Sequence, residues 1–85
     1  MEVKLSTQAI ADFRFWEKSG NKAIQKKIQL LIAEMQKHPF EGLGKPEALK
    51  HDLAGKYSRR INREHRIVYD VSESVIQIYS LKGHY

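Results

Sequence analysis

The chain has 85 residues, 41% of them hydrophobic and 29% charged, which is enough for one small globular domain and typical of neither a disordered nor a fibrous protein. It contains no cysteine, which excludes a disulfide scaffold, a cysteine-ligated zinc finger and a thiol nucleophile. Lys and Arg number 15 against 10 Asp and Glu, and the formal net charge is +5. Most of the excess lies between positions 44 and 66. Such a block is either a solvated basic surface or a nucleic-acid contact.

The N-terminal part predicts a short strand followed by a helix. Residues 2–5 alternate between polar and apolar side chains, which is typical of a strand. Ser6 or Thr7 can cap the helix that follows, and Gly20 fits the position just beyond its C-terminus. The leading residues lack the apolar core of a signal peptide, and no apolar run approaches the ~20 residues of a membrane span. We therefore expect a cytoplasmic protein with no membrane association.

The second helix is the clearest element. Asn21 can cap it, and Pro39 should end it. One apolar stripe at helical spacing comprises Ile24, Ile28, Leu31, Ile32 and Met35. Residues 39–47 hold both prolines and two glycines and predict a loop.

The remainder predicts strands. Residues 57–62, 66–71 and 75–81 alternate or are mostly apolar, and residues 72–74 predict a tight turn. Two helices followed by successive strands indicate an α+β fold, with two N-terminal helices packed on one face of a small antiparallel β-sheet. Residues 1–85 then form a single domain. The aromatic side chains that fit helix or strand periodicity are expected in its core, namely Phe13, Phe15, Trp16 and Tyr69.

The acid–base residues suit cleavage of RNA without a metal. The RNA 2′-hydroxyl is already adjacent to the phosphate, so one base, one phosphate-binding cation and one acid suffice. Glu47, Arg66 and His84 could fill these roles, but their spacing alone does not show that they converge. Glu47 could instead pair with Lys45 or Lys50. No metal-binding spacing and no phosphate-binding glycine loop occurs, so neither a metal nor a cofactor is expected.

These residues lie within a longer pattern. Its segments are Phe40-Glu41-Gly42, Gly44-Lys45-Pro46-Glu47, Leu49-Lys50-His51, Leu53, Ser58-Arg59-Arg60-Ile61, Glu64-His65-Arg66, Val68-Tyr69 and the terminal His84-Tyr85. The pattern closely resembles the YoeB/Txe toxins of the RelE/ParE superfamily of type II toxin–antitoxin systems. The resemblance covers the whole chain and is densest between residues 39 and 69. Two positions depart from it, because Tyr57 stands where the family has Trp and Ala48 where it often has Pro.

The resemblance implies a RelE-like fold and an mRNA endoribonuclease that acts in the ribosomal A site and inhibits translation. It also implies a homodimer and a YefM/Phd-type antitoxin partner, besides the ribosome and mRNA. By motif, Glu47 would be the general base, Arg66 the phosphate stabiliser and His84 the general acid, with Tyr85 assisting. A further set would contact messenger or ribosomal RNA, namely Lys45, Lys50, Arg59 and Arg60.

Other interpretations remain open at this point. The protein could block the A site by occupancy without cleaving RNA, or it could poison DNA gyrase as ParE-like members do. Arg59 and Arg60 could form structural ion pairs. An unbroken last strand would also place His84 on the face of Ile76 and Ile78, opposite Arg66. We therefore predict a β-bulge near residues 82–83.

Overall fold

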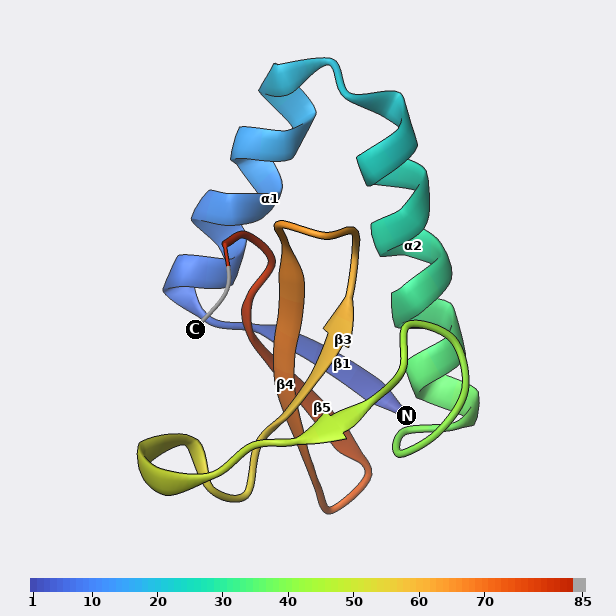
Figure 1. Cartoon of the computed structure of the whole chain (residues 1–85), viewed down its shortest axis with the longest axis vertical. Helices are drawn as coiled ribbons and strands as arrows, with labels where there is room; N and C mark the ends of the chain where they lie inside the picture. The colour runs from blue at the N-terminus through green and yellow to red at the C-terminus, as the bar shows by residue number, and fades with distance from the viewer. Residues whose placement is uncertain (84–85) are drawn as a thin grey trace.

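The computed structural model describes residues 1–83 and forms one sheet with two helices. The strands are β1 (Glu2–Leu5), β2 (Glu47–Ala48), β3 (Tyr57–Arg60), β4 (Arg66–Ser72) and β5 (Val75–Ser80). Their order in the sheet is β1-β5-β4-β3-β2. Figure 1 shows α1 (Thr7–Ser19) and α2 (Lys22–Lys37) joined by a short turn and flanking the upper part of the sheet. The α+β prediction is confirmed.

The two helices begin and end where local chemistry predicts. Ser6 accepts a hydrogen bond from the Ala9 amide at the start of α1, and Gly20 follows its end with a left-handed φ of 72°. Asn21 accepts from the Ile24 amide and begins α2. The helix ends at Lys37, two residues before Pro39.

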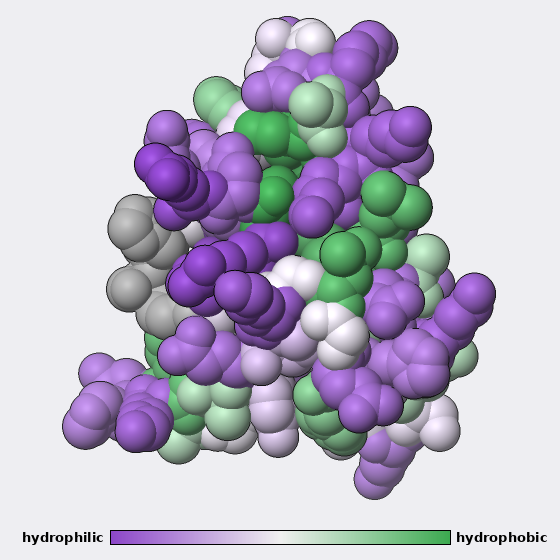
Figure 2. Space-filling model, turned by 45° about the vertical axis from the view of Figure 1, so that its right-hand side comes forward, coloured by the Kyte–Doolittle hydropathy of each residue, from purple (hydrophilic) through white to green (hydrophobic). Residues whose placement is uncertain are grey.

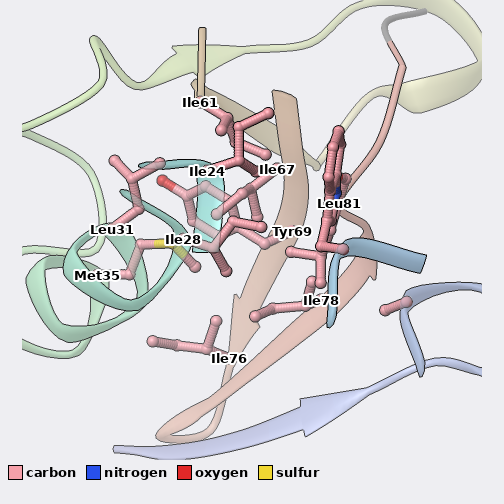
Figure 3. Close-up of a cluster of buried hydrophobic side chains, with 12 residues drawn as sticks. Ile24, Ile28, Leu31, Met35, Ile61, Ile67, Tyr69, Ile76, Ile78 and Leu81 are labelled. Carbon is pink, nitrogen blue, oxygen red and sulfur yellow. The ribbon is translucent and has the colours of Figure 1, made fainter. Parts of the chain in front are cut away.

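The core lies between the helices and one face of the sheet. Along α2, the predicted stripe is buried at Ile24, Ile28, Leu31 and Met35. Figure 3 shows these side chains pointing toward Tyr69 of β4 and Ile76 and Ile78 of β5. Trp16 and Ala9 of α1 belong to the same cluster, so both helices cover the same face of the sheet. Tyr69 and Trp16 are core residues as predicted, and Phe13 packs at the edge, but Phe15 is exposed.

The sheet is mixed rather than wholly antiparallel. Strand β1 pairs in parallel with β5, with Val3 opposite Ile76 and Leu5 opposite Ile78. The other pairings are antiparallel. Alternation of side chains predicts which face a residue occupies but not the direction of its neighbouring strand, so this pairing was not predicted.

A β-bulge interrupts the pairing of β4 with β5 earlier than predicted. Val68 pairs with Ser80 but Tyr69 pairs with Ile78, which leaves Tyr79 as the extra residue. Beyond the bulge the alternation is reversed, because Ile78 and Leu81 both lie in the core. The break therefore occurs at Tyr79 rather than near residues 82–83. The position of His84, which motivated the prediction, lies outside the described residues.

The structure also has two short elements that the sequence did not indicate. The predicted loop ends in β2, which pairs Glu47 with Ser58. A 3₁₀ turn spans His51–Leu53. Within residues 1–83, neither helix is long and apolar enough to cross a bilayer.

Candidate active site

The sheet brings Glu47 and Arg66 together on the face that points away from the helices, here called the outer face. Register places Glu47 opposite Ser58, Ser58 opposite Val68, and Arg60 opposite Arg66. Residues opposite one another in a sheet project to the same side. The outer face therefore gathers side chains from β2, β3 and β4 that are up to 21 positions apart in the sequence.

Glu47 and Arg66 form an ion pair. The Arg66 Nη1 atom lies 3.7 Å from Glu47 Oε2, and the side chains are 19% and 63% exposed respectively. In such a pair the guanidinium can bind an anionic group, and the accessible carboxylate can accept a proton from a neighbouring hydroxyl. The alternative that Glu47 pairs with Lys45 or Lys50 is not the arrangement seen here.

Ser58 is a site residue that sequence reasoning missed. Its side chain is buried, and its Oγ accepts a hydrogen bond of 3.2 Å from Arg66 Nη1. The hydroxyl thus helps to fix the guanidinium on the outer face. The available signal was strand alternation, which places Ser58 and Arg60 on the same face of residues 57–62.

Arg59 is a correction to the predicted RNA contacts. Its exposed fraction is 0%, and it lies on the helix-covered face. The guanidinium donates to the backbone carbonyls of Leu43 and Glu41 at 3.0 Å each and also to the carbonyl of His38. Its Nε donates to the Tyr69 hydroxyl at 3.1 Å. With its donors used inside the protein, Arg59 is not available to RNA.

These bonds hold the loop that leads into β2. Residues 38–43 supply three of the acceptors, and the Tyr69 hydroxyl donates to the Pro39 carbonyl at 2.7 Å. Burial raises the pKa of Tyr69 above its usual value, and the hydrogen bond and charge of Arg59 oppose that rise. The loop lies beside the C-terminal turns of α2 in Figure 1. Arg59 and Tyr69 therefore position Glu47 indirectly, by fixing the backbone before it.

Gly44 is required where this loop meets the sheet. Its φ is 85°, and a Cβ there would lie 2.8 Å from Leu31 Cδ2 and 3.1 Å from Arg59 Cβ. Its carbonyl accepts from the Arg60 amide at 2.8 Å. The backbone passes so close to α2 and β3 that only glycine fits without displacement.

Two of the predicted RNA contacts line one shallow hollow. Lys45 and Arg60 are exposed there, and Lys27 of α2 and Arg63 of the β3–β4 turn complete a ring of four cations. The other lining residues, Gly44, Ile61 and Asn62, carry no charge. Lys27 and Arg63 were not among the predicted contacts, because they come from separate elements that only the fold brings together. Lys50 lies elsewhere, in a hollow that it lines together with Glu47.

The view in Figure 2 shows hydrophilic side chains over most of the surface, with hydrophobic atoms visible in several separate places. The hollow between the helices is lined by the apolar Phe13, Trp16 and Ile28 and by the polar Glu17, Gln25 and Gln29. Unlike the basic hollow, it has no Lys or Arg in its lining.

Side chains near β5 extend the outer face. The Tyr79 hydroxyl donates to Asp70, and the hydrogen bond raises the pKa of Tyr79. Lys56 Nζ lies 4.2 Å from the centre of the Tyr79 ring. The bulge places this aromatic ring and cation beside the outer face, and neither was predicted.

The remaining predicted site residues, His84 and Tyr85, lie outside the described residues. The segment before them is well defined: the Gly83 amide donates to His65 Nδ1 at 2.8 Å, and the Gly83 carbonyl accepts from the Arg66 amide at 3.0 Å. Within residues 1–83, no group of three or more His, Asp or Glu side chains is arranged to hold a metal ion.

Comparison with known proteins gives consistent matches over the full chain. The family model for the YoeB-like toxin of bacterial type II toxin–antitoxin systems matches residues 5–85. The toxin YoeB of Escherichia coli strain K12 is 44% identical over 85 residues, which cover all of both chains. A solved YoeB/ParE toxin from Agrobacterium tumefaciens has a TM-score of 0.95 at 40% identity, again covering all of both chains.

Staphylococcus aureus provides two further matches. A YoeB–YefM complex has a TM-score of 0.90 at 44% identity and covers all of this chain and 98% of that one. A YoeB dimer has a TM-score of 0.90 at 43% identity with the same coverage.

Proposed function

Because the chain belongs to the YoeB-like toxin family of bacterial type II toxin–antitoxin systems, we propose that it is an endoribonuclease that cleaves mRNA in the ribosomal A site. The observation that carries this proposal is the pairing of Glu47 with Arg66 at 3.7 Å on the outer face. A carboxylate base beside a guanidinium is the minimum arrangement for attack by a 2′-hydroxyl on its own phosphate.

The reaction follows from the positions of these two groups. Glu47 accepts the 2′-hydroxyl proton as the 2′-oxygen forms a bond to phosphorus. Arg66, held by Ser58, neutralises the charge that builds on the non-bridging phosphoryl oxygens. The bond from phosphorus to the 5′-oxygen then breaks. The products are a 2′,3′-cyclic phosphate and a 5′-hydroxyl end, and no metal or cofactor takes part.

The leaving oxygen needs a proton. We assign this step to His84, with Tyr85 assisting, because the family motif ends in these residues and the segment before them is anchored beside Arg66. A histidine suits the role since its usual pKa lies near the pH of the cell.

RNA binding is assigned to the exposed cations. Lys45 and Arg60 of the basic hollow would contact backbone phosphates, and Lys50 would contact RNA close to Glu47. The predicted consequence is binding that weakens steeply as salt is raised. The ribosome would supply the remaining positioning of the messenger RNA, which the small hollows of an 85-residue protein do not provide.

We also propose a YefM/Phd-type antitoxin and a homodimer. The S. aureus relative has been solved as a YoeB–YefM complex and as a dimer, and this chain matches both along its whole length. A surface with an excess of five positive charges favours an acidic, partly disordered partner that folds on binding. In the bacterial cell both partners would meet in the cytoplasm, where ribosomes are.

The test is cleavage of mRNA on programmed ribosomes. The buffer contains the magnesium that ribosomes require and no other divalent metal. Wild type should cut in the A-site codon and leave 5′-hydroxyl ends. Glu47→Gln and His84→Gln should each lower the rate by about 100-fold or more. Matched controls are Glu73→Gln, in the β4–β5 turn, and His38→Gln, whose side chain is exposed.

The alternative of a non-catalytic A-site plug predicts a different outcome. Translation would stop without a cut, and the Glu47 and His84 variants would inhibit as well as wild type does. That result would overturn the proposed cleavage while leaving ribosome binding intact.

A further inference from the structure

We propose that Asp12, Trp16 and His65 are positioning residues: they clamp residues 81–83 beside Arg66, and cleavage at the Glu47–Arg66 site depends on this clamp. The inference rests on the proposed function, since it gives His84 and Tyr85 a catalytic purpose. The clamp residues themselves have a positioning role. They belong to α1 and to the β3–β4 turn, and they touch neither RNA nor the reacting atoms.

The first half of the clamp holds Leu81. Its amide donates to Asp12 Oδ2 at 2.9 Å, and its carbonyl accepts from Trp16 Nε1 at 2.8 Å. Asp12 and Trp16 lie four residues apart on α1, so their side chains share one face of the helix. Both are buried, and the Leu81 side chain is inaccessible in the core. The main chain of Leu81 is therefore held by the helix on both of its polar groups.

The second half of the clamp holds Gly83. Its amide donates to His65 Nδ1 at 2.8 Å, and its carbonyl accepts from the Arg66 amide at 3.0 Å. Arg66 thus connects the clamp with the candidate active site through two different groups. Its guanidinium contacts Glu47, and its backbone fixes the residue that precedes His84.

Residues 81–83 are held by specific contacts although they lie beyond the last strand. Here β5 ends at Ser80, yet the next three residues carry four hydrogen bonds and a contact of Lys82 Nζ at 4.0 Å from the centre of the Phe15 ring. Such contacts fix the backbone of residues 81–83, and a fixed backbone lowers the entropic cost of bringing reacting groups together.

His65 connects the two halves. Its ring lies edge-on to Trp16, with centroids 4.8 Å apart and planes at 80°. Because Nδ1 accepts from Gly83, the ring proton must reside on Nε2, which lies 3.8 Å from the Glu64 carboxylate. Ring packing and hydrogen-bond acceptance are therefore two separate properties of one side chain, and substitution can separate them.

The test compares two substitutions of His65. His65→Phe keeps a ring against Trp16 but has no acceptor for the Gly83 amide. His65→Asn loses the ring, but its Oδ1 occupies nearly the position of Nδ1 and can accept. We expect His65→Phe to lower the single-turnover cleavage rate at saturating ribosomes by about 10- to 100-fold. His65→Asn should lower the rate much less than His65→Phe does. The ribosome concentration for half-maximal rate should stay unchanged in both variants.

Hydrogen exchange of the Gly83 amide provides a readout that does not depend on cleavage. It should be protected in wild type and in His65→Asn and unprotected in His65→Phe. Trp16→Phe, which removes the indole donor to Leu81 together with part of the buried ring, is the second variant in case His65→Phe fails to fold, and it too should lower the rate. His38→Asn, at an exposed histidine outside the clamp, is the control.

The outcomes separate the two proposals. A His65→Phe variant that cleaves at the wild-type rate, or a slow variant whose Gly83 amide remains protected, would overturn the clamp as a positioning device. If wild type itself does not cut, the proposed function fails, and the catalytic purpose of the clamp fails with it. Gly83 exchange would in that case still show whether His65 holds the segment.

Discussion

The two faces of the sheet use arginine in opposite ways. Arg59 lies on the helix-covered face with 0% of its surface exposed, and its donors bind carbonyls of the loop before β2. Arg66 lies on the outer face, partly exposed, beside the Glu47 carboxylate. The two residues belong to paired strands, yet one is buried and holds a loop, while the other is partly exposed beside a carboxylate, where the proposed function uses it. A basic residue in a functional motif therefore has to be assigned to a face before it is assigned a role.

The largest expected effects come from replacing each arginine by methionine. Arg66→Met should lower mRNA cleavage by about 10²- to 10³-fold, because no cation then opposes the charge on the phosphoryl oxygens. Its fold should be retained. Arg59→Met should instead destabilise the protein by about 3 kcal/mol, because three loop carbonyls and the Tyr69 hydroxyl lose a buried donor. Chemical denaturation and single-turnover cleavage measure the two effects.

Arg60→Met is the matched control for Arg59. Its side chain is exposed, and the bond from its amide to the Gly44 carbonyl does not depend on the side chain. Its stability should change by no more than about 0.5 kcal/mol. The distinction between the faces would be wrong if Arg59→Met were as stable as wild type and instead weakened ribosome binding.

The same contrast shows which features could be predicted from the sequence. The helix caps at Ser6 and Asn21 and the stripe of α2 were predicted because each depends on residues close together in the chain. Strand alternation also groups Arg59 with Tyr57 and Ile61 on one face of residues 57–62. The motif resemblance implies that Arg59 contacts RNA, but the structure buries Arg59 on the helix-covered face together with Ile61.

The site itself required the fold. Glu47 and Arg66 approach each other because β2, β3 and β4 pair in one particular register, and a two-residue strand such as β2 has too little pattern to be recognised. The bulge at Tyr79 depends on how β5 fits against β4 and not on β5 alone. Long-range pairing of this kind is set by packing, so it leaves only weak local signals.

An intermediate effect is expected at the glycine between the loop and the sheet. Gly44→Ala should cost about 2 kcal/mol, since it combines a left-handed φ with a Cβ that overlaps Leu31. Gly55→Ala is the control, because Gly55 has a similar φ of 91° but no atom within 4 Å of the added Cβ. It should cost about 1 kcal/mol, from backbone strain alone. Equal losses in chemical denaturation would mean that the loop can move away from α2, and that Arg59 does not fix it.

The smallest effect concerns the hydroxyl that Arg59 and the loop share. Tyr69→Phe should lower the free energy of unfolding by about 1 kcal/mol near neutral pH, because the Pro39 carbonyl loses its donor. Burial raises the pKa of Tyr69 above its ordinary value of 10.0, so the folded protein holds the phenolic proton more tightly than the unfolded chain does. The stabilisation from this difference is complete below the unfolded pKa and is lost as the pH rises through the folded pKa.

Wild type should consequently lose its advantage over Tyr69→Phe as the pH rises above about 10. The pKa of Tyr79 is raised as well, by its hydrogen bond to Asp70, but that residue is present in both proteins and its contribution cancels in the difference. Denaturation of the two proteins side by side from about pH 8 to about pH 11 measures the change. A difference that stays constant over this range would mean that the Tyr69 hydroxyl is hydrated. Water would then reach the hydrogen bonds by which Arg59 and Tyr69 hold the loop. The environments of Arg59 and Arg66 would differ less than the contrast between the two faces requires.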